Sequence, residues 1–524
     1  MMRLIKKHSH KILLTLILLG SAFFHLYRIE DYITFLGDEG RDVLVVWNIL
    51  HGHLTLLGPT SSVGGFFLGP IYYYFMTPFL WLFHYDPVGP AVMIALLGIV
   101  TVWFVYKIGA EFFGSTAGLI GAFFYAISPL VLIYSRSSWN PNAMPFFTLL
   151  TMYILYQAVK KKSMKLFALV GFLFGIDMQL HYIETFIIPV IAVYIPLGRL
   201  INSPQKVKKI SQVLWGTVKE YCFVLGGFVI GFSPFLAFEA RHDFLNFRNI
   251  FTFIFHSKDT GAGGNFFLAI GTIFFRIFGR LVAGFPQPER IQHYPLWELQ
   301  LWGIFSIVLG IGAVGLIIWQ LKKQKKQTDG ILQKSLLLLW LGFGILLFGF
   351  YKKSVYDYYF EFLFPLPALL VGNLFSTLWQ KKMIWKFAVG IVMLFLIVLN
   401  LSDNPLMYAP NRQLNQARVI SQFVFDKTDG KPFNFALITG GNSDHAYRYF
   451  FTVWGRPPVT IENAINDPQR KTVTDQLLVV CESLPCSPLG VSLWEIAGFG
   501  RAEVTGHWHV SVVDVYRLVH YTGK

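Results

Sequence analysis

Apolar runs long enough to cross a lipid bilayer recur through most of the chain, and no other feature constrains the fold as strongly. A transmembrane helix needs about 20 mainly apolar residues. The runs lie at residues 12–29, 88–107, 115–134, 142–159, 165–180, 183–198, 219–238, 300–320, 334–350, 358–378 and 383–401. Only 14% of the 524 residues are charged, compared with about 25% in typical soluble proteins. We therefore predict a polytopic α-helical membrane protein with about eleven transmembrane helices.

Lysine and arginine clusters between these runs predict the orientation of the helices, because cytoplasmic loops are enriched in both residue types. With eleven crossings and a cytoplasmic N-terminus, every cluster falls on the inner side. The clusters comprise Arg3, Lys6, Lys7, Lys11, Lys107, Lys160, Lys161, Lys162, Lys165, Arg199, Lys206, Lys208, Lys209, Lys322, Lys323, Lys325, Lys326, Lys381, Lys382 and Lys386. We therefore expect a multi-pass protein of the plasma (cell) membrane whose C-terminal region is extracytoplasmic.

The basic N-terminus and the first apolar run together also resemble a signal peptide. Phe23, Phe24 and His25 stand where a cleavage site would need small residues. We therefore expect the first helix to remain uncleaved.

The net charge of +15 could also indicate a nucleic-acid-binding protein. The cations, however, lie in short clusters between apolar runs, which is the pattern of membrane proteins. No DNA- or RNA-binding motif accompanies them. We therefore exclude nucleic acid as a partner and expect membrane lipid instead.

The first outer loop, residues 30–87, opens with an amphipathic segment at 34–51. The segment begins with four charged residues, namely Asp38, Glu39, Arg41 and Asp42. Helical spacing then gives an apolar stripe of Val43, Val46, Trp47 and Leu50. One interpretation is that Asp38 caps a helix lying in the headgroup layer, where the helix dipole favours acidic residues. The other is that Asp38 is a catalytic carboxylate held at the membrane surface.

Residues 66–85 predict a second surface helix in the same loop. If this segment crossed the membrane, the cations at Lys107 and at 160–165 would face outward, against the positive-inside rule. Its tyrosine and tryptophan residues suit an interfacial position instead. We therefore expect both helices of the loop to lie on the outer surface.

The chain divides into a membrane domain, residues 1–402, and an outer α/β domain, residues 403–524. The second part gains charge and alternates strand-like with helix-like segments. The expected strands are Phe433–Ile438, Leu477–Val480 and Val510–Leu518, and the expected helices are Arg412–Phe425 and His445–Trp454. Cys222 lies in an apolar run and is expected to be inert, whereas Cys481 and Cys486 could pair in an oxidising compartment.

Several polar side chains are expected on the outer side, where helices end. Asn140 precedes a proline, which is typical of a helix start, but this does not explain Arg136 nearby. His181 and Glu184 are three residues apart, and such a pair could bind a metal, form a structural hydrogen bond or contact a substrate. We treat Tyr182, between them, as a further substrate contact.

Lys352 and Lys353 are also expected outside, where the positive-inside rule depletes cations. A cation pair kept there favours an anionic ligand, either a specific lipid phosphate or anionic headgroups in general. The long outer stretch 239–299 offers further cations, most of which we expect to be solvated. These are Arg276, Arg280, Arg290 and His293. We expect the membrane spans themselves to lack buried charge.

This arrangement resembles the polytopic glycosyltransferases of the GT-C fold, and most closely their glycosyltransferase family 39-like branch. That branch includes protein O-mannosyltransferases and lipid A aminoarabinose transferases. The matching residues are Asp38-Glu39, Gly69-Pro70-Ile71-Tyr72-Tyr73-Tyr74, Ser128-Pro129 ahead of Arg136, and the segment Tyr358–Pro367. The resemblance covers roughly residues 10–400. Leu68-Gly69 departs from it, because family members often carry a lysine before this proline.

The resemblance implies transfer of a sugar from a polyprenyl-phosphate donor to a hydroxyl acceptor on the outer face, usually with inversion. Asp38 would be the catalytic base, and Glu39 its neighbour in acceptor or metal contacts. Arg136, Lys352 and Lys353 could bind the donor phosphate, which fits the need of a departing phosphate for cations. The candidate substrate contacts are Arg41, Tyr72, Asn140, His181, Tyr182, Glu184 and Tyr358. The candidate metal ligands are Glu39, His181 and Glu184, and no cofactor other than a divalent metal is expected.

Two other classes of protein remain as alternatives. A transporter or flippase of lipid-linked glycans would have broken helices and charges at mid-membrane. A non-catalytic scaffold for the outer domain would leave Asp38 without a chemical role. The sequence does not identify the sugar, the oligomeric state or the acceptor, which could be a protein, a lipid or a polysaccharide.

Overall fold

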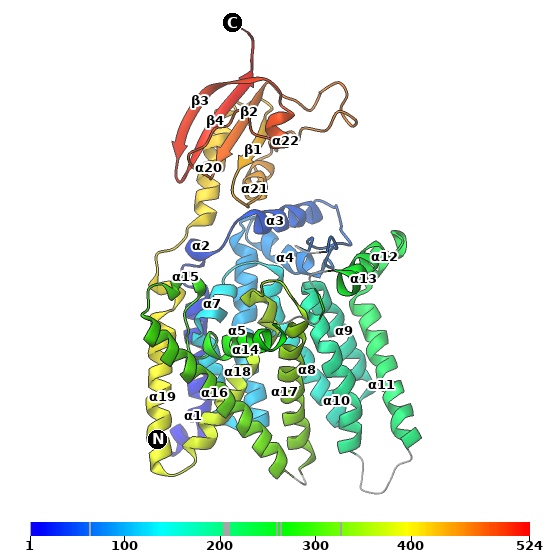
Figure 1. The fold of residues 1–524 in the computed structure, drawn as a ribbon, viewed down its shortest axis with the longest axis vertical. Coiled ribbons are helices and arrows are strands. Elements are labelled where there is room, and N and C mark those ends of the chain that lie inside the picture. Colours follow the sequence, from blue (N-terminus) through cyan, green and yellow to red (C-terminus); the bar gives the residue numbers. More distant parts are fainter. Residues whose placement is uncertain are drawn as a thin grey trace.

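The computed structural model describes residues 2–61, 64–202, 210–257, 260–261, 265–324 and 327–523. A helical bundle forms one layer, and a small α/β domain lies above one end of it (Figure 1). Three helices, α2 (Ile29–Tyr32), α3 (Gly37–Leu50) and α4 (Ile71–Leu82), lie between the two. Five of the topology-setting residues, Lys206, Lys208, Lys209, Lys325 and Lys326, lie outside the described residues.

All eleven expected apolar runs contain helices. The long helices of the bundle are α1 (Met2–Leu26), α5 (Val88–Phe113), α6 (Ser115–Ile127), α8 (Met144–Lys161), α9 (Met164–Leu180), α10 (Ile188–Ile201), α11 (Ile210–Gly231), α16 (Leu296–Lys323), α17 (Thr328–Leu346), α18 (Pro365–Trp379) and α19 (Met383–Ser402). Shorter helices connect them: α7 (Pro129–Tyr134), η1 (Asn140–Ala143), η2 (Tyr182–Ile187), α12 (Ser233–Arg241), α13 (Leu245–His256), α14 (Phe266–Gly279), α15 (Pro288–Ile291), η3 (Leu347–Phe350), η4 (Asp357–Leu363) and η5 (Pro405–Met407).

Seven helices among the described residues are long and apolar enough to cross a membrane. The number is eight if η4 and α18, which are bent by 56° at the break between them, form one span. Helices α6, α8 and α9 do not meet these limits by themselves, although they pack within the bundle. The multi-pass architecture is therefore confirmed, whereas the count of eleven crossings stays a prediction.

The loop between α1 and α5 contains the two short helices that the sequence predicts. Helix α4 has 12 residues, which is too short to cross a membrane. Helix α3 buries Val43 and Val46 against α4 and the outer domain, as its apolar stripe predicts. The loop therefore carries two short helices at the end of the bundle nearest the outer domain (Figure 1).

The outer domain contains one mixed sheet. Its elements are α20 (Gln413–Lys427), β1 (Asn434–Ile438), α21 (His445–Val453), β2 (Gln476–Cys481), α22 (Trp494–Ala497), β3 (Ala502–Val510) and β4 (Val513–His520). The strand order is β1-β2-β4-β3, with β1 parallel and β4 antiparallel to β2. The strand expected at Val510–Leu518 corresponds to β4 but begins too early, and β3 was not predicted, because the chain turns at Ser511, with a φ of 56°, from β3 into β4.

The sequence left open whether Cys481 and Cys486 form a disulfide, and in the structure they do. Cys481, at the end of β2, forms a disulfide with Cys486. Cys222 is exposed on the surface of α11 rather than buried in the bundle.

Helices α9 and α11 approach each other through glycines, which let two backbones come close. A Cβ atom added to Gly171 would lie 1.8 Å from the Val224 oxygen, and one added to Gly227 would lie 1.8 Å from the Ala168 oxygen. Both distances are far below van der Waals contact. The contact therefore requires glycine at both positions.

We predict that Gly227→Ala lowers the thermal stability of the purified protein, because overpacking costs about 1–3 kcal/mol. The matched control is Gly226→Ala, since an added Cβ at Gly226 has nothing within 4 Å. Thermal unfolding of both variants in the same detergent measures the difference. Equal midpoints for the two variants would contradict this account of the contact.

Candidate active site

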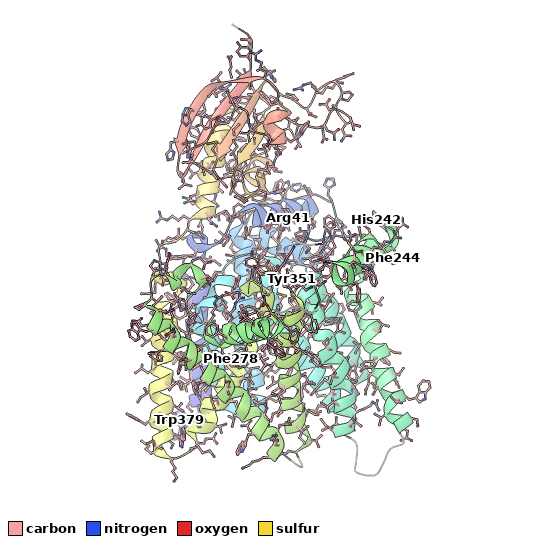
Figure 2. The ribbon with its side chains drawn as sticks, in the orientation of Figure 1. Arg41, His242, Phe244, Phe278, Tyr351 and Trp379 are labelled. Atoms are coloured by element: carbon pink, nitrogen blue, oxygen red, sulfur yellow. A yellow bond between two sulfur atoms is a disulfide. The ribbon has the colours of Figure 1, made fainter. Side chains whose placement is uncertain are left out.

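The first turn of α3 holds a charged group in which one arginine serves two carboxylates. Arg41 Nη1 donates to Asp38 Oδ1 at 2.8 Å, and its Nη2 donates to Asp42 Oδ1 at 2.7 Å. Asp42 is fully buried and also accepts from the Tyr73 hydroxyl at 3.3 Å. The Asp38 side chain, by contrast, is 56% exposed. Arg41 lies between the bundle and the outer domain, so this group is at their junction (Figure 2).

Glu39 has a structural partner in its own helix. Its Oε2 accepts from the Leu36 amide at 3.0 Å, which satisfies a donor at the helix start. Burial raises the pKa of Glu39 to about 7. Burial also raises the pKa of Asp42 to about 6, although the Arg41 guanidinium opposes this shift. Asp38 therefore offers the exposed carboxylate of this turn, and the geometry favours a capping role for Glu39.

A continuous set of contacts leads from α4 down to η4. The Tyr72 hydroxyl lies 2.7 Å from Ser138 Oγ. The next residue, Trp139, packs its ring against Tyr358 with centroids 4.6 Å apart. Tyr358 in turn contacts the ring of His181 at 6.0 Å. Three of the candidate substrate contacts, Tyr72, Tyr358 and His181, are thus brought together.

Two other candidates make contacts that hold loops in place. Asn140 donates its amide to the Leu180 oxygen at 2.6 Å, joining η1 to the end of α9. The Tyr182 hydroxyl donates to the Phe67 oxygen. Asn140 and Tyr182 therefore use their polar atoms within the protein.

The candidate phosphate ligands differ in their surroundings. Arg136 is buried and donates to the carbonyl oxygens of Phe24 and Tyr27, at the end of α1. Unpaired carbonyls at a helix end are commonly satisfied by cations, so this geometry favours a structural role for Arg136. Lys352 and Lys353 are exposed in the loop ahead of η4.

The candidate metal ligands do not form a site. His181 Nδ1 accepts from the Ile183 amide at 3.2 Å, and Glu184 accepts from the Thr148 hydroxyl. In the described parts of the chain, no three His, Cys, Asp or Glu side chains lie close enough together to hold a metal ion. The side chains of His181 and Glu184 therefore bond to separate partners rather than to each other.

The expectation that the long-loop arginines are solvated is wrong for three of them. Arg276 Nε donates to Asp357 Oδ1 at 2.9 Å, and Arg280 Nη1 donates to the same oxygen at 2.7 Å. The side chains of Arg276, Arg280 and Asp357 are only 12%, 9% and 8% exposed. Arg290 pairs with Asp403. The spacing of four residues between Arg276 and Arg280 places both on one helix face and could have indicated a shared partner.

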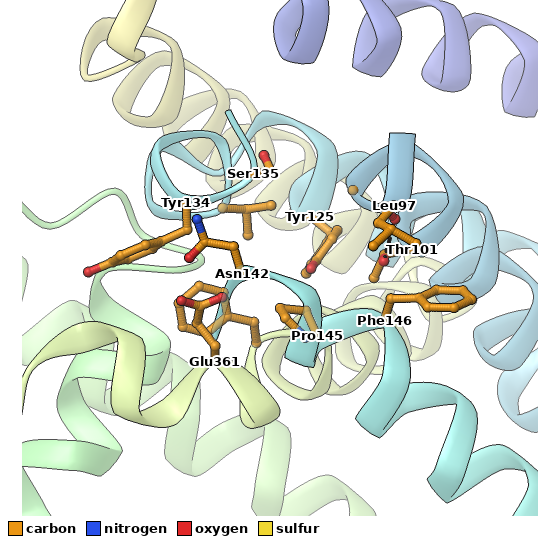
Figure 3. A pocket seen from close by; sticks show the side chains of 12 residues that line it. Leu97, Thr101, Tyr125, Tyr134, Ser135, Asn142, Pro145, Phe146 and Glu361 are labelled. Atoms are coloured by element: carbon orange, nitrogen blue, oxygen red, sulfur yellow. Dashed lines mark hydrogen bonds between the residues drawn. The ribbon is translucent and has the colours of Figure 1, made fainter. Parts of the chain in front are cut away.

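Buried carboxylates also contradict the expectation that the bundle lacks buried charge. Asp177, Glu184 and Glu361 have no exposed surface. Glu361 lines a small pocket between α5, α6, α8 and η4, where Figure 3 shows its carboxylate and the Asn142 amide pointing into the same space. Within the described residues, neither carboxylate oxygen of Glu361 has a hydrogen-bond partner, and Asn142 Oδ1 has none either. Such a group is costly to bury, so sites of this kind are commonly functional.

Residues 68–237 match the family model described as dolichyl-phosphate-mannose-protein mannosyltransferase. This segment contains α4, Arg136, Asn140 and the His181–Glu184 turn. No curated protein matches the chain by sequence.

Solved structures match over nearly the whole chain. ArnT from Cupriavidus metallidurans, bound to undecaprenyl phosphate, has a TM-score of 0.61 and 10% identity, covering 97% of this chain and 98% of that one. The archaeal oligosaccharyltransferase AglB from Archaeoglobus fulgidus, in complex with an inhibitory peptide and a dolichol-phosphate, has a TM-score of 0.53 and 15% identity, covering 91% and 70%. The Archaeoglobus fulgidus oligosaccharyltransferase in complex with Zn and sulfate has a TM-score of 0.51 and 15% identity, covering 89% and 67%.

These matches confirm the GT-C fold and the resemblance inferred from the sequence. At 10–15% identity the structural matches establish the fold alone. Together with the family match over residues 68–237, they indicate a membrane glycosyltransferase.

We predict that Glu361→Gln raises the thermal stability of the protein at pH 8, because glutamine places no charge in the pocket. Removing an unpaired buried charge is worth about 1 kcal/mol or more. The control is Glu220→Gln, which removes the charge that pairs with Arg199 and puts an amide nitrogen in place of one of the two accepting oxygens, so it should lower stability. A fall in the unfolding midpoint of Glu361→Gln would show that the carboxylate is satisfied in the native protein.

Proposed function

We propose that this protein is a membrane glycosyltransferase that transfers a sugar from a polyprenyl-phosphate donor to a hydroxyl acceptor at the outer membrane face. The observation that carries the proposal is the exposed Asp38 carboxylate at the start of α3, held at the junction of bundle and outer domain in a GT-C fold. Two proteins of the same fold are described in complex with a polyprenyl phosphate, ArnT with undecaprenyl phosphate and AglB with a dolichol-phosphate. Their ligands support the donor class proposed for this chain.

In the proposed reaction, Asp38 accepts the proton of the acceptor hydroxyl as its oxygen attacks the anomeric carbon. The bond between that carbon and the phosphate oxygen breaks, and polyprenyl phosphate leaves. A single displacement of this kind inverts the anomeric centre. Arg41 holds the Asp38 side chain in place through the hydrogen bond at 2.8 Å.

The departing phosphate requires positive charge. Lys352 and Lys353 are exposed and can reach a ligand at the membrane surface. Behind them, Arg276 and Arg280 share one carboxylate, Asp357, which leaves an excess positive charge next to Tyr358. We therefore propose Lys352 and Lys353 as phosphate ligands. The proposal gives Arg136 a structural role only.

A transporter of lipid-linked glycans remains the second candidate function. The buried Glu361 and the 56° bend between η4 and α18 are features that such a protein would have. The two candidates differ in whether the sugar leaves its lipid. Turnover of the donor is therefore the measurement that separates them.

We predict that Asp38→Asn lowers sugar transfer by about 10²–10⁴-fold, the usual contribution of a general base. Purified protein in nanodiscs would be given radiolabelled polyprenyl-phosphate sugars together with a membrane extract as the source of acceptor. Asp31→Asn is the control, because Asp31 is an acid of the same loop whose side chain pairs with the exposed Arg28. If Asp38→Asn transfers sugar at the wild-type rate, Asp38 is not the catalytic base. Folded wild-type protein that turns over none of the donors would refute the glycosyltransferase itself.

The proposed orientation places the outer domain outside the cell and the Lys160–Lys165 loop in the cytoplasm. We predict that, in a Cys222→Ser background, Ile465→Cys reacts with a membrane-impermeant maleimide on intact cells. Ile465 is 90% exposed in the outer domain. Lys162→Cys, which lies in the inner loop, should react only after the cells are permeabilised. The reverse labelling pattern would show that the orientation in the membrane is opposite to the proposed one.

A further inference from the structure

The outer domain contacts the turn of α3 that carries Asp38. Helix α21 lies directly over α3 (Figure 1). A Cβ atom added to Gly37 would lie 2.1 Å from Ser443 Oγ, and one added to Gly40 would lie 2.3 Å from the Ala446 nitrogen. Gly37 and Gly40 flank Asp38 and Glu39 in the sequence. The backbone of the outer domain therefore packs directly against the backbone of this turn.

One hydrogen bond crosses this contact at the helix start. The Gly37 amide donates to Asn442 Oδ1 at 2.8 Å. Amides in the first turn of a helix have no partner within the helix, so an acceptor from another segment is needed. Asn442 supplies that acceptor from the loop that follows β1.

The orientation of the Asn442 side chain is itself determined by Glu482, the residue after β2. Asn442 Nδ2 donates to both carboxylate oxygens of Glu482 at 3.2 Å. Thr439 and Tyr447 donate their hydroxyls to the same carboxylate at 2.8 and 2.7 Å. A carboxylate only accepts, so the amide nitrogen of Asn442 must face Glu482 and its oxygen must face Gly37.

Contacts on either side hold the domain in this position. Arg418 of α20 pairs with Asp86 at 2.8 Å, and the Tyr449 hydroxyl of α21 donates to the Tyr85 oxygen at 2.5 Å. The Phe35 amide, two residues ahead of Gly37, donates to Gln413 at 3.2 Å. The loop before α3 and the loop after α4 are thus both attached to the outer domain.

We propose that Asn442 and Glu482 are positioning residues for Asp38. Resting on the function proposed above, this inference makes the outer domain part of the catalytic machinery. Glu482 orients Asn442, and Asn442 fixes the backbone from which the Asp38 side chain projects. Displacement of a catalytic group by about 1 Å can lower a rate by about 100-fold, so a small shift of this turn matters.

The test uses a substitution and its suppressor in the full-length protein. Asn442→Asp places a carboxylate against Glu482, and the repulsion should displace the loop from Gly37. Glu482→Gln added to Asn442→Asp restores a donor facing an acceptor, because the glutamine amide can donate to the new carboxylate. We expect Asn442→Asp to lower kcat about tenfold or more with the KM for the donor unchanged, and the double variant to recover most of the loss. Glu482→Gln alone should lower kcat by less than Asn442→Asp does, because the glutamine carbonyl can still accept from Asn442 although the side chain no longer only accepts.

The matched control is Asn466→Asp. Asn466 donates to Glu462 at 3.3 Å in an exposed asparagine–glutamate pair elsewhere in the outer domain. This variant should leave kcat unchanged. A loss of activity equal to that of Asn442→Asp would mean that the effect is a general destabilisation of the domain.

A second readout does not depend on activity. Hydrogen–deuterium exchange of the amides at 37–41 should accelerate in Asn442→Asp and return towards the wild-type rate in the double variant. Unchanged exchange and unchanged kcat in Asn442→Asp would overturn the inference, and so would a change in KM alone. If wild-type protein turns over no donor, the proposed function fails, while the exchange data still decide whether the two residues position the turn.

Discussion

The hydrogen bond from Gly37 to Asn442 joins the helical bundle to the outer domain at the turn that carries Asp38. The bundle buries its apolar side chains between helices, whereas the outer domain buries its own around the sheet. A third apolar cluster contains residues of α3, α4, α20 and α21 and so belongs to both. The start of α3 is therefore held from two sides, which gives the exposed Asp38 a rigid base.

Two kinds of buried charge occur near this junction, and they have different consequences. Asp42 and Asp357 are each paired with arginines, so they stabilise the elements that carry them. Glu361 has no such partner among the described residues. Stability alone does not account for an unpaired buried carboxylate. Glu361 is therefore a candidate for binding a ligand or a proton.

Local patterns in the sequence predict the helices, the two surface helices of the first loop and the strands β1, β2 and β4. These features depend on hydropathy and periodicity over short windows. The hairpin between β3 and β4 was missed because the turn at Ser511 contains no glycine or proline. The pairing of Arg276 with Asp357 and the contacts of Arg136 with α1 join residues about 80 and 110 positions apart, which periodicity does not reveal. Those contacts decide which cations remain accessible to a ligand.

The disulfide between Cys481 and Cys486 has a consequence for when the protein becomes active. It closes a short ring that begins immediately before Glu482. Disulfides form and persist in oxidising compartments rather than in the cytoplasm. In the proposed orientation, the ring around Glu482 closes only after the C-terminal region has been exported. Export and oxidation would then precede the final arrangement of α3, and a newly made chain on the cytoplasmic side would lack that support.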